Sequence, residues 1–373
     1  MTLETIKALR ADGLAALSNR FGIGVKRHGT FSNLVQLKYS QRESPMGERI
    51  VQECRGLILD EADDWSVVAL PFTKFFNHGE PNAHAIEWAT ARVYEKLDGS
   101  LMTLYPYRGR WHVASSSVPD ASGATGGTFG GTFADLFNQT WSSFGYAMPR
   151  PDEGRACFMF ELMTPHNRIV CRHAASRVVL IGARDLDTLV ERDPEDVARQ
   201  YGWACARSFP LSTPEECLTA ASAIDPMEGE GYVVRDAAFR RVKIKSPRYV
   251  ALAHLKEGLS GRRMLEVVRA NEAAELLTHF PELRPFHDRI RKPFDALCDA
   301  ADASYRDLKG IYDRKEFAAA AVRTPFPAVL FALRDGKTST AREFFATCTM
   351  PALERQIGIN LDEWAEPDMA NDT

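Results

Sequence analysis

The sequence lacks the features by which several classes of protein are recognised. No apolar run approaches the roughly 20 residues needed to cross a bilayer, and the start has no basic segment followed by an apolar core. The seven cysteines are odd in number and never spaced C-x-x-C, and the nine histidines form no ligand-spaced cluster. We therefore expect a cytoplasmic protein with reduced cysteines, without a secretory signal, disulfides or a zinc site.

An excess of basic charge is also missing. Lys and Arg total 46 against 50 Asp and Glu, which gives a net charge of -4 and a pI of about 6.2. This balance argues against a protein coated in basic residues for nucleic acid, but it leaves room for a local basic groove. The hydrophobic content of 45% is ordinary, and a chain of 373 residues is long enough for two or three domains with their own cores.

The chain changes character near residue 255. Before that point, short β-rich runs alternate with turns; after it, the sequence is rich in Ala, Leu, Glu and Arg with helical periodicity. We predict an α+β fold with antiparallel sheets over 1–255 and an all-α domain over 256–373, its helices ended or kinked by prolines. The expected strands are 30–39, 56–60, 66–70, 91–95, 100–105, 111–115, 157–163, 178–183, 231–235 and 241–245. The expected helices are 1–20, 133–143, 193–201, 251–277, 284–321 and 327–333, with the prolines at 281, 285, 293 and 325.

The sharpest chemical signal is the segment Tyr94-Glu95-Lys96-Leu97-Asp98-Gly99. Its lysine follows a β-like run and precedes Asp-Gly, a turn signal, which would hold the amine at the edge of a cleft. A lysine becomes a nucleophile only after losing its proton, and partial burial or a nearby cation promotes that loss. In isolation, K-x-D-G is short and common, and a solvated turn lysine would be the ordinary interpretation.

Further segments, taken together in their order along the chain, strengthen the catalytic interpretation of Lys96. They are Glu53-Cys54-Arg55-Gly56, 71–77 (PFTKFFN), 158–170 (FMFELMTPHNRIV), 230–234 (EGYVV) and 243–250 (KIKSPRYV). With the lysine segment, this set resembles the covalent nucleotidyltransferase superfamily of nucleic-acid ligases and capping enzymes. It is most similar to the T4-type RNA ligase 1 family, and the resemblance extends over roughly residues 30–255.

The resemblance implies an ATP-dependent RNA ligase that joins 5′-phosphate and 3′-hydroxyl ends. In the family, a lysine at the position of Lys96 forms lysyl-AMP, AMP moves to the RNA 5′-phosphate, and the 3′-hydroxyl then displaces AMP. The resemblance also implies a nucleotidyltransferase domain with ATP-grasp-like antiparallel sheets over 1–255 and a helical RNA-specificity domain over 256–373. The implied partner of this expected monomer is RNA, with tRNA repair as the family's typical task.

Site residues are also implied by the resemblance. The catalytic residues would be Lys96, Glu161, Glu230, Lys243 and Lys245. Nucleotide contacts would come from Arg55, Lys74, Phe76, Lys96, Gly99, Glu161, Lys243, Lys245 and Tyr249. Mg²⁺, replaceable by Mn²⁺, would be held through water by Glu161 and Glu230.

Physical chemistry gives several of these positions a reason. Lys243 and Lys245 alternate across Ile244, so on a strand both ammonium groups can face one phosphate. Their proximity could also depress the pKa of Lys96. Glu161 and Glu230 lie in apolar, strand-like runs and need a donor or a cation if buried. Each assignment has an ordinary alternative. The lysines could lie on a solvated strand face, the acids on a solvent-facing edge, and Phe76 in the core.

Other features leave their roles open. Asn167 and Arg168 could order a loop or touch RNA. The family commonly carries phosphate-binding lysines where this chain has Ser115, Ser116 and Ser117. That phosphate contact could be lost here, or Arg108, Arg110 or a substrate-side residue could supply it. A basic run could form a track for an RNA backbone or a charged interdomain surface. It consists of Arg235, Arg240, Arg241, Lys243, Lys245, Arg248, Lys256, Arg262 and Arg263, opposed by Asp236 and Glu257.

Two alternative functions remain open at this point. The same chemistry could act on another acceptor, either DNA ends or an RNA cap formed by guanylyl transfer. A noncatalytic protein that binds RNA ends could also retain the fold. The intact set of candidate catalytic residues argues against the second alternative.

Overall fold

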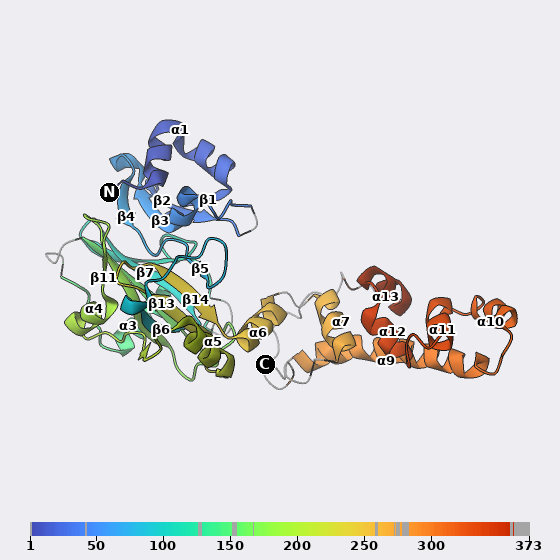
Figure 1. The fold of residues 1–373 in the computed structure, drawn as a ribbon. Helices are drawn as coiled ribbons and strands as arrows, with labels where there is room; N and C mark the ends of the chain where they lie inside the picture. The colour runs from blue at the N-terminus through green and yellow to red at the C-terminus, as the bar shows by residue number, and fades with distance from the viewer. Residues whose placement is uncertain are drawn as a thin grey trace. The chain divides into compact units, whose positions relative to one another are not determined.

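The chain forms two compact units, Met1–Ala251 and Leu252–Thr373. This computed structural model describes residues 2–41, 43–125, 129–150, 155–166, 168–257, 260–271, 273, 277, 283–358 and 361. The first unit mixes strands and helices, and the described part of the second is helical (Figure 1), which confirms the predicted α+β class. The observed boundary and the predicted one, between 255 and 256, both fall within helix α6 (Pro247–Glu257).

A four-stranded antiparallel sheet begins the first unit, in the order β1-β2-β3-β4. Helix α1 (Glu4–Phe21) buries Leu9, Leu17 and Phe21 in the same core as the sheet, as its apolar spacing predicted. The remaining elements are β1 (Ile23–Arg27), β2 (Leu34–Tyr39), α2 (Arg49–Glu53), β3 (Arg55–Asp60), the 3-10 turn η1 (Glu61–Asp63) and β4 (Ser66–Ala69). The sequence did not predict β1, because only Ile23 of that strand is buried and no apolar alternation marks it.

Two five-stranded sheets form the rest of the first unit. One has the order β12-β6-β13-β14-β5 and the other β11-β10-β9-β7-β8; every pairing is antiparallel except that of β5 with β14. The first sheet contains β5 (Phe76–Asn77), β6 (Arg92–Lys96), β12 (Ser208–Phe209), β13 (Gly231–Arg235) and β14 (Arg241–Lys245). The second contains β7 (Ser100–Tyr107), β8 (Arg110–Ser115), β9 (Ala156–Met163), β10 (Arg177–Asp185) and β11 (Glu191–Arg192).

Helices cover one face of each large sheet and leave the other for the site. On β9, Phe158 and Phe160 belong to the core that also buries Phe137 and Trp141 of helix α3. Because side chains alternate along a strand, Glu161 points to the opposite face. The other helices of this unit are α4 (Pro194–Tyr201) and α5 (Pro214–Ala223), and a 3-10 turn η2 spans Trp88–Thr90. Helix α3 (Phe133–Ser143) has the predicted bounds, whereas α5 was not predicted.

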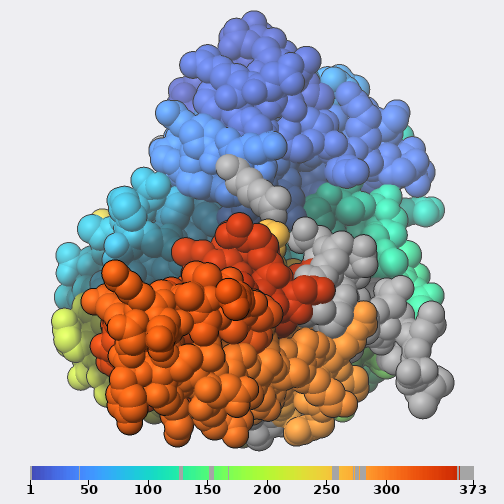
Figure 2. Space-filling model, turned by 90° about the vertical axis from the view of Figure 1, so that its right-hand side faces the viewer, coloured from blue at the N-terminus to red at the C-terminus, as the bar shows by residue number. Residues whose placement is uncertain are grey.

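The second unit is organised around helix α9 (Arg284–Leu308). The residues of this unit appear in Figure 2 as a continuous packed mass in orange and red. The prediction that Pro293 breaks a helix is wrong, since α9 continues through it with Ile290 and Phe294 buried on either side. The other helices are α7 (Gly261–Ala270), α10 (Arg314–Ala321), α11 (Pro327–Arg334), α12 (Ala341–Thr347) and α13 (Met350–Ile357). Among the described helices, none combines the length and apolarity that a bilayer span requires.

Gly231 lies where the backbone of β14 leaves no room for a side chain on β13. Its φ of +139° lies in a region that favours glycine, and an added Cβ would press on the carbonyl oxygen of Ile244 and lie 2.8 Å from the Cα of Lys245. A side chain at this position would therefore disturb the register of both strands.

Gly231→Ala is expected to destabilise the first unit by about 2 kcal/mol, the strain of a disfavoured φ with a backbone contact. For a unit of this size, that loss lowers the thermal midpoint by about 4–8 °C. Calorimetry should find Gly47→Ala close to wild type, because its added Cβ would meet only Asn82 Oδ1 at 3.7 Å. Equal midpoints for the two variants would contradict the assigned role of Gly231.

Candidate active site

A cleft with a cavity volume of about 160 Å³ lies between the uncovered faces of the two large sheets. One wall consists of residues on β6, β13 and β14, and the other includes one residue each from β7, β9 and β10 together with residues of the connecting segments. Five of the predicted site residues line it: Arg55, Lys96, Glu161, Lys243 and Lys245. The fold thus brings predicted site residues from four separate segments of the sequence to one cavity.

Glu230 holds two of the lysines in place. In the sheet, Gly231 lies opposite both Lys96 and Lys245, which places the neighbouring carboxylate between the two side chains. Its Oε2 accepts a hydrogen bond from Lys96 Nζ at 2.6 Å, and its Oε1 lies 2.7 Å from Lys245 Nζ. The Glu230 side chain is only 5% exposed, so the two ammonium groups supply the compensation that a buried carboxylate needs.

The acidic neighbours determine the proton affinity of Lys96. Burial by itself would lower its pKa, but Glu230 and Glu161 outweigh burial and raise the pKa above the ordinary value. The prediction that Lys243 and Lys245 depress this pKa is therefore wrong for the ligand-free protein. The physical reason is that Glu230 stands between Lys96 and Lys245 and compensates both charges.

Lys243 has a different environment. No carboxylate among the described residues lies within ion-pair distance of it, and its Nζ lies 4.9 Å from the ring centroid of Phe75. Burial lowers its pKa to about 7, and the charges of Arg55, Lys96, Lys74 and Lys245 act in the same direction. Because a bound anion would favour the charged form, this wall of the cleft is suited to a phosphate.

Arg55 adds a second cation without full compensation. Burial lowers its pKa, and its Nη1 has no hydrogen-bond partner among the described residues. Arg55 is the first residue of β3, and its guanidinium lies 5.1 Å from the ring centroid of Phe75. A planar guanidinium with unused donors is well suited to phosphate oxygens.

Four predicted nucleotide contacts do not line the cleft. Phe76 is buried on β5 beside β14, and its neighbour Phe75 lines the cavity instead, so the core alternative describes Phe76 better. Lys74 Nζ lies over the Phe76 ring, 5.4 Å from its centroid. Gly99 is where the turn approaches β9, since an added Cβ would lie 3.1 Å from Cγ of Glu161. Tyr249 instead binds Asp98, which lies in the turn after Lys96.

Asp98 joins three of the sequence segments, a role that the sequence analysis missed. Its buried carboxylate accepts hydrogen bonds from the backbone N–H groups of Val170 and Cys171 at 2.9 and 2.7 Å, and from Tyr249 Oη at 2.6 Å. The K-x-D-G pattern had identified Asp98 only as a turn residue. The sequence could have indicated this role of Asp98. An aspartate that is buried in an apolar setting needs several hydrogen-bond donors.

Glu161 is the carboxylate best suited to a divalent cation. Burial raises its pKa to about 7, against the opposing charges of Lys96 and Arg55. Both oxygens of Glu230 are engaged by lysines, and the described residues contain no cluster of three or more metal-ligating side chains. This donor set fits Mg²⁺ held mainly through its water shell, as magnesium prefers, with Glu161 as the nearest protein oxygen.

Several of the open features have structural roles away from the cleft. Arg168 Nε donates to the carbonyl of Val170 at 2.9 Å, while Asn167 lies outside the described residues. Arg108 and Arg110 line a separate cavity at the β7–β8 turn and do not line the cleft that contains Lys96. Their binding of a phosphate in place of the family's lysines stays a prediction.

The basic run does not form a continuous exposed track among its described side chains. Arg235 and Arg241 are buried, which removes them from any surface path. Three others are paired with acids: Arg240 with Asp236, Arg262 with Glu354 and Arg263 with Glu266. The spacing of basic residues in the sequence could not reveal this, because it does not show which faces of β13 and β14 are covered.

The sequence analysis also missed cleft residues that share a strand face with the predicted ones. Tyr94 precedes Lys96 by two positions, and Arg241 precedes Lys243 by two, so each pair faces the same side. Arg235 follows Val233 on β13 in the same way. The period of two along these strands was the signal that could have found them.

This cleft, in which several cations surround a lysine at a turn between two largely antiparallel sheets, defines a class of protein suited to an anionic ligand. A family model described as RNA ligase matches residues 53–249, more than half of the chain, and the chain therefore belongs to the RNA ligase family.

The chain is similar to two viral proteins in particular. It is 26% identical over 301 residues to a protein of Autographa californica nuclear polyhedrosis virus described as a putative bifunctional polynucleotide kinase/RNA ligase, covering 76% of this chain and 42% of that protein. It is 28% identical over 283 residues to an RNA ligase of Rhodothermus phage RM378, covering 59% of this chain and 64% of that protein. The chain thus spans less than two thirds of the length of each relative.

Solved structures of a Naegleria gruberi RNA ligase overlap part of the chain. One with ATP and Mn is 15% identical, with a TM-score of 0.35, and covers 44% of this chain and 51% of that one. Another, with pyrophosphate, is 16% identical, with a TM-score of 0.35, and covers 45% and 52%.

We expect Lys243→Met to stabilise the ligand-free protein by about 1–2 kcal/mol at pH 6, since it removes a half-buried charge without a partner. The folded-state pKa of about 7 lies below the ordinary 10.5, so protonated Lys243 opposes folding below pH 7. This cost fades as the pH rises toward 10.5, and the gain should have vanished there.

The measurement is urea unfolding at pH 6 and near pH 10, with Lys245→Met as the matched control. That control removes one partner of buried Glu230 and should destabilise by about 1–3 kcal/mol. A Lys243→Met protein that is less stable than wild type at pH 6 would contradict the assigned environment.

Proposed function

We propose that this protein is an ATP-dependent RNA ligase that joins 5′-phosphate and 3′-hydroxyl ends through a lysyl-AMP intermediate on Lys96. The observation that carries the proposal is that Lys96 lines a cleft together with Arg55 and Lys243. Neither of these two cations has a carboxylate within ion-pair distance among the described side chains. Membership of the RNA ligase family supports the reaction class. Within that class, a lysine beside such cations is suited to attack a phosphorus whose oxygens those cations bind.

In the first step, Lys96 Nζ forms a bond to the α-phosphorus of ATP, and the bond from that phosphorus to pyrophosphate breaks. The amine must first lose a proton, and Oε2 of Glu230, 2.6 Å away, is the nearest acceptor. Lys243, Lys245 and Arg55 would bind the phosphoryl oxygens as their negative charge develops. Bound Mg²⁺ would neutralise phosphate charge, with Glu161 holding its water shell.

Two transfers to RNA complete the proposed reaction. The 5′-phosphate of an RNA end attacks the phosphorus of lysyl-AMP, which frees Lys96 and gives a 5′–5′ linked adenylylated RNA. A 3′-hydroxyl then attacks the RNA phosphate, AMP leaves, and a phosphodiester bond seals the strand. We assign the selection of the RNA to the helical unit, Leu252–Thr373, and repair of tRNA or another cleaved RNA as the biological task.

Wild-type protein incubated with α-labelled ATP and Mg²⁺ should acquire covalent label, and Lys96→Ala should lose it by at least about a thousandfold, since neither other cleft lysine is held at the same point. The matched control is Lys26→Ala on β1, a lysine outside the cleft, which should label as wild type does. A chase with RNA carrying a 5′-phosphate should move the label from protein to RNA.

The same experiment separates the alternatives. Label from GTP in preference to ATP would indicate capping-type guanylyl transfer, and discharge only onto DNA would indicate a DNA acceptor. Absence of label in a wild-type protein that still binds RNA ends as tightly as Lys96→Ala would favour a noncatalytic end-binding protein.

A further inference from the structure

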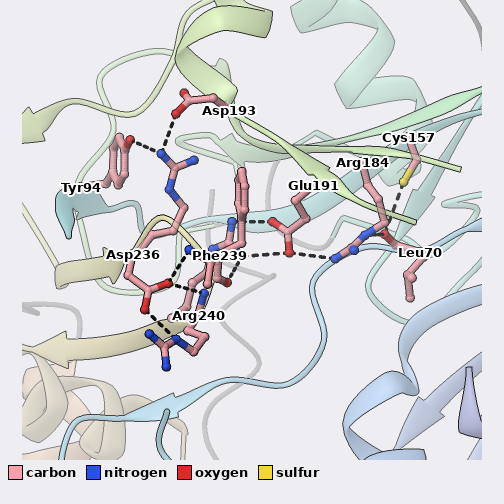
Figure 3. Close-up of polar contacts among 12 residues, drawn as sticks. Leu70, Tyr94, Cys157, Arg184, Glu191, Asp193, Asp236, Phe239 and Arg240 are labelled. Atoms are coloured by element: carbon pink, nitrogen blue, oxygen red, sulfur yellow. Dashed lines mark hydrogen bonds and ion pairs between the residues drawn. The ribbon is translucent and has the colours of Figure 1, made fainter. Parts of the chain in front are cut away.

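One end of the cleft contains a buried arginine that the proposed chemistry does not use. Arg235 lines the cavity with Tyr94, Pro194 and Cys205, and its side chain is only 7% exposed. Tyr94 and Asp193 converge on its guanidinium (Figure 3), where Nη2 donates to Tyr94 Oη at 3.0 Å and to Asp193 Oδ2 at 2.7 Å. These contacts fix the orientation of the group.

The rest of this guanidinium is without partners. Nε and Nη1 of Arg235 are buried and have no hydrogen-bond partner among the described residues. The rings of Tyr94 and Phe239 lie against the group, with centroids 5.3 and 4.9 Å from its central carbon. Unused buried donors on a charged side chain are costly, so they indicate that a ligand supplies acceptors at this end of the cleft.

A neighbouring arginine provides the contrast. Arg241 lines the same cavity and is equally buried, but Glu191 accepts from both of its terminal nitrogens, at 3.0 and 2.5 Å. Glu191 also accepts from Arg184 at 2.8 Å (Figure 3), so this group of side chains is internally satisfied. Only Arg235, of these three, retains unused donors.

Two arginines that line the cleft, Arg55 and Arg235, retain unused donors. Arg55 lies with Lys243 at the wall assigned above to phosphate, and neither has a carboxylate within ion-pair distance among the described residues. Arg235 lies beside Tyr94, and Asp193 already balances its charge at 2.7 Å. A nucleotide carries anionic phosphate oxygens and a neutral base with hydrogen-bond acceptors. Its phosphates would therefore use Arg55 and Lys243, and its base the free donors of Arg235.

The arrangement of the free donors restricts the contact with the base. Nη2 shares one edge of the guanidinium with Nε and the other with Nη1, and both of its hydrogens are engaged by Tyr94 and Asp193. Neither edge of Arg235 can therefore offer two free donors side by side. A single free donor can bond one ring nitrogen of adenine, since each of these nitrogens accepts one hydrogen bond.

We propose that Arg235 is a base-binding residue, which donates one hydrogen bond to a ring nitrogen of adenine. The proposal rests on the proposed function in that the ligand is an adenine nucleotide. Tyr94 and Asp193 are positioning residues that keep the guanidinium in place.

The test is calorimetric binding of AMP and its 1-deaza, 3-deaza and 7-deaza analogues, none of which can adenylylate Lys96. In wild type, one deaza analogue should bind about tenfold more weakly than AMP, the loss of one charged hydrogen bond. Arg235→Lys should bind AMP about tenfold more weakly and should no longer distinguish that analogue from AMP.

The matched control is Arg240→Lys, which changes the half-exposed arginine that pairs with Asp236 and lies outside the cleft. It should retain the wild-type series of affinities. Three deaza analogues that all bind wild type within about twofold of AMP would overturn the proposal, and this result needs no variant to fold. If wild type is adenylylated by ATP yet treats all analogues alike, the base assignment fails alone; if it binds no AMP, the assignment fails together with the proposed function.

Discussion

The site depends on one buried carboxylate shared by two lysines. Glu230 contacts Lys96 with one oxygen and Lys245 with the other, and the three side chains come from adjacent strands of one sheet. Removing a single partner would leave a charge of either sign without compensation in a buried setting. The register of β6, β13 and β14 is therefore tied to the chemistry, because a shift of one residue would turn the lysines to the opposite face.

Close backbone approaches make that arrangement possible. Gly231 lets β13 lie against β14 directly beside Glu230, and Gly99 lets the turn after Lys96 lie against β9, next to Glu161. Asp98 then fastens the same turn to the segment at Val170 through two backbone hydrogen bonds. Fixed glycines and a fully satisfied aspartate thus hold the lysine between two acidic side chains without any contribution from a ligand.

Much of this could be predicted from sequence, for identifiable reasons. Strands β13 and β14 and helix α3 had clear apolar patterns and turn signals, and their predicted bounds match those observed. Strand β1 and helix α5 lacked such patterns. At the site, the residue types and order identified Lys96, Glu161 and Lys243, but sequence spacing cannot show which carboxylate compensates which cation. That is why the direction of the pKa shift of Lys96 was mistaken and why Arg235 was interpreted as a surface charge.

The distribution of buried charge explains how an acidic protein can bind an anion. In the first unit, the buried arginines and lysines divide into those whose charge a carboxylate balances and those that lack one. Arg241 shares Glu191, and Lys96 and Lys245 share Glu230, whereas Arg55 and Lys243 have no carboxylate within ion-pair distance among the described residues. The overall charge of -4 is set largely at the surface and does not cancel this local excess inside a low-dielectric cleft. A phosphate entering the cleft would supply the missing negative charge, so its affinity arises from what the fold leaves uncompensated as much as from what it pairs.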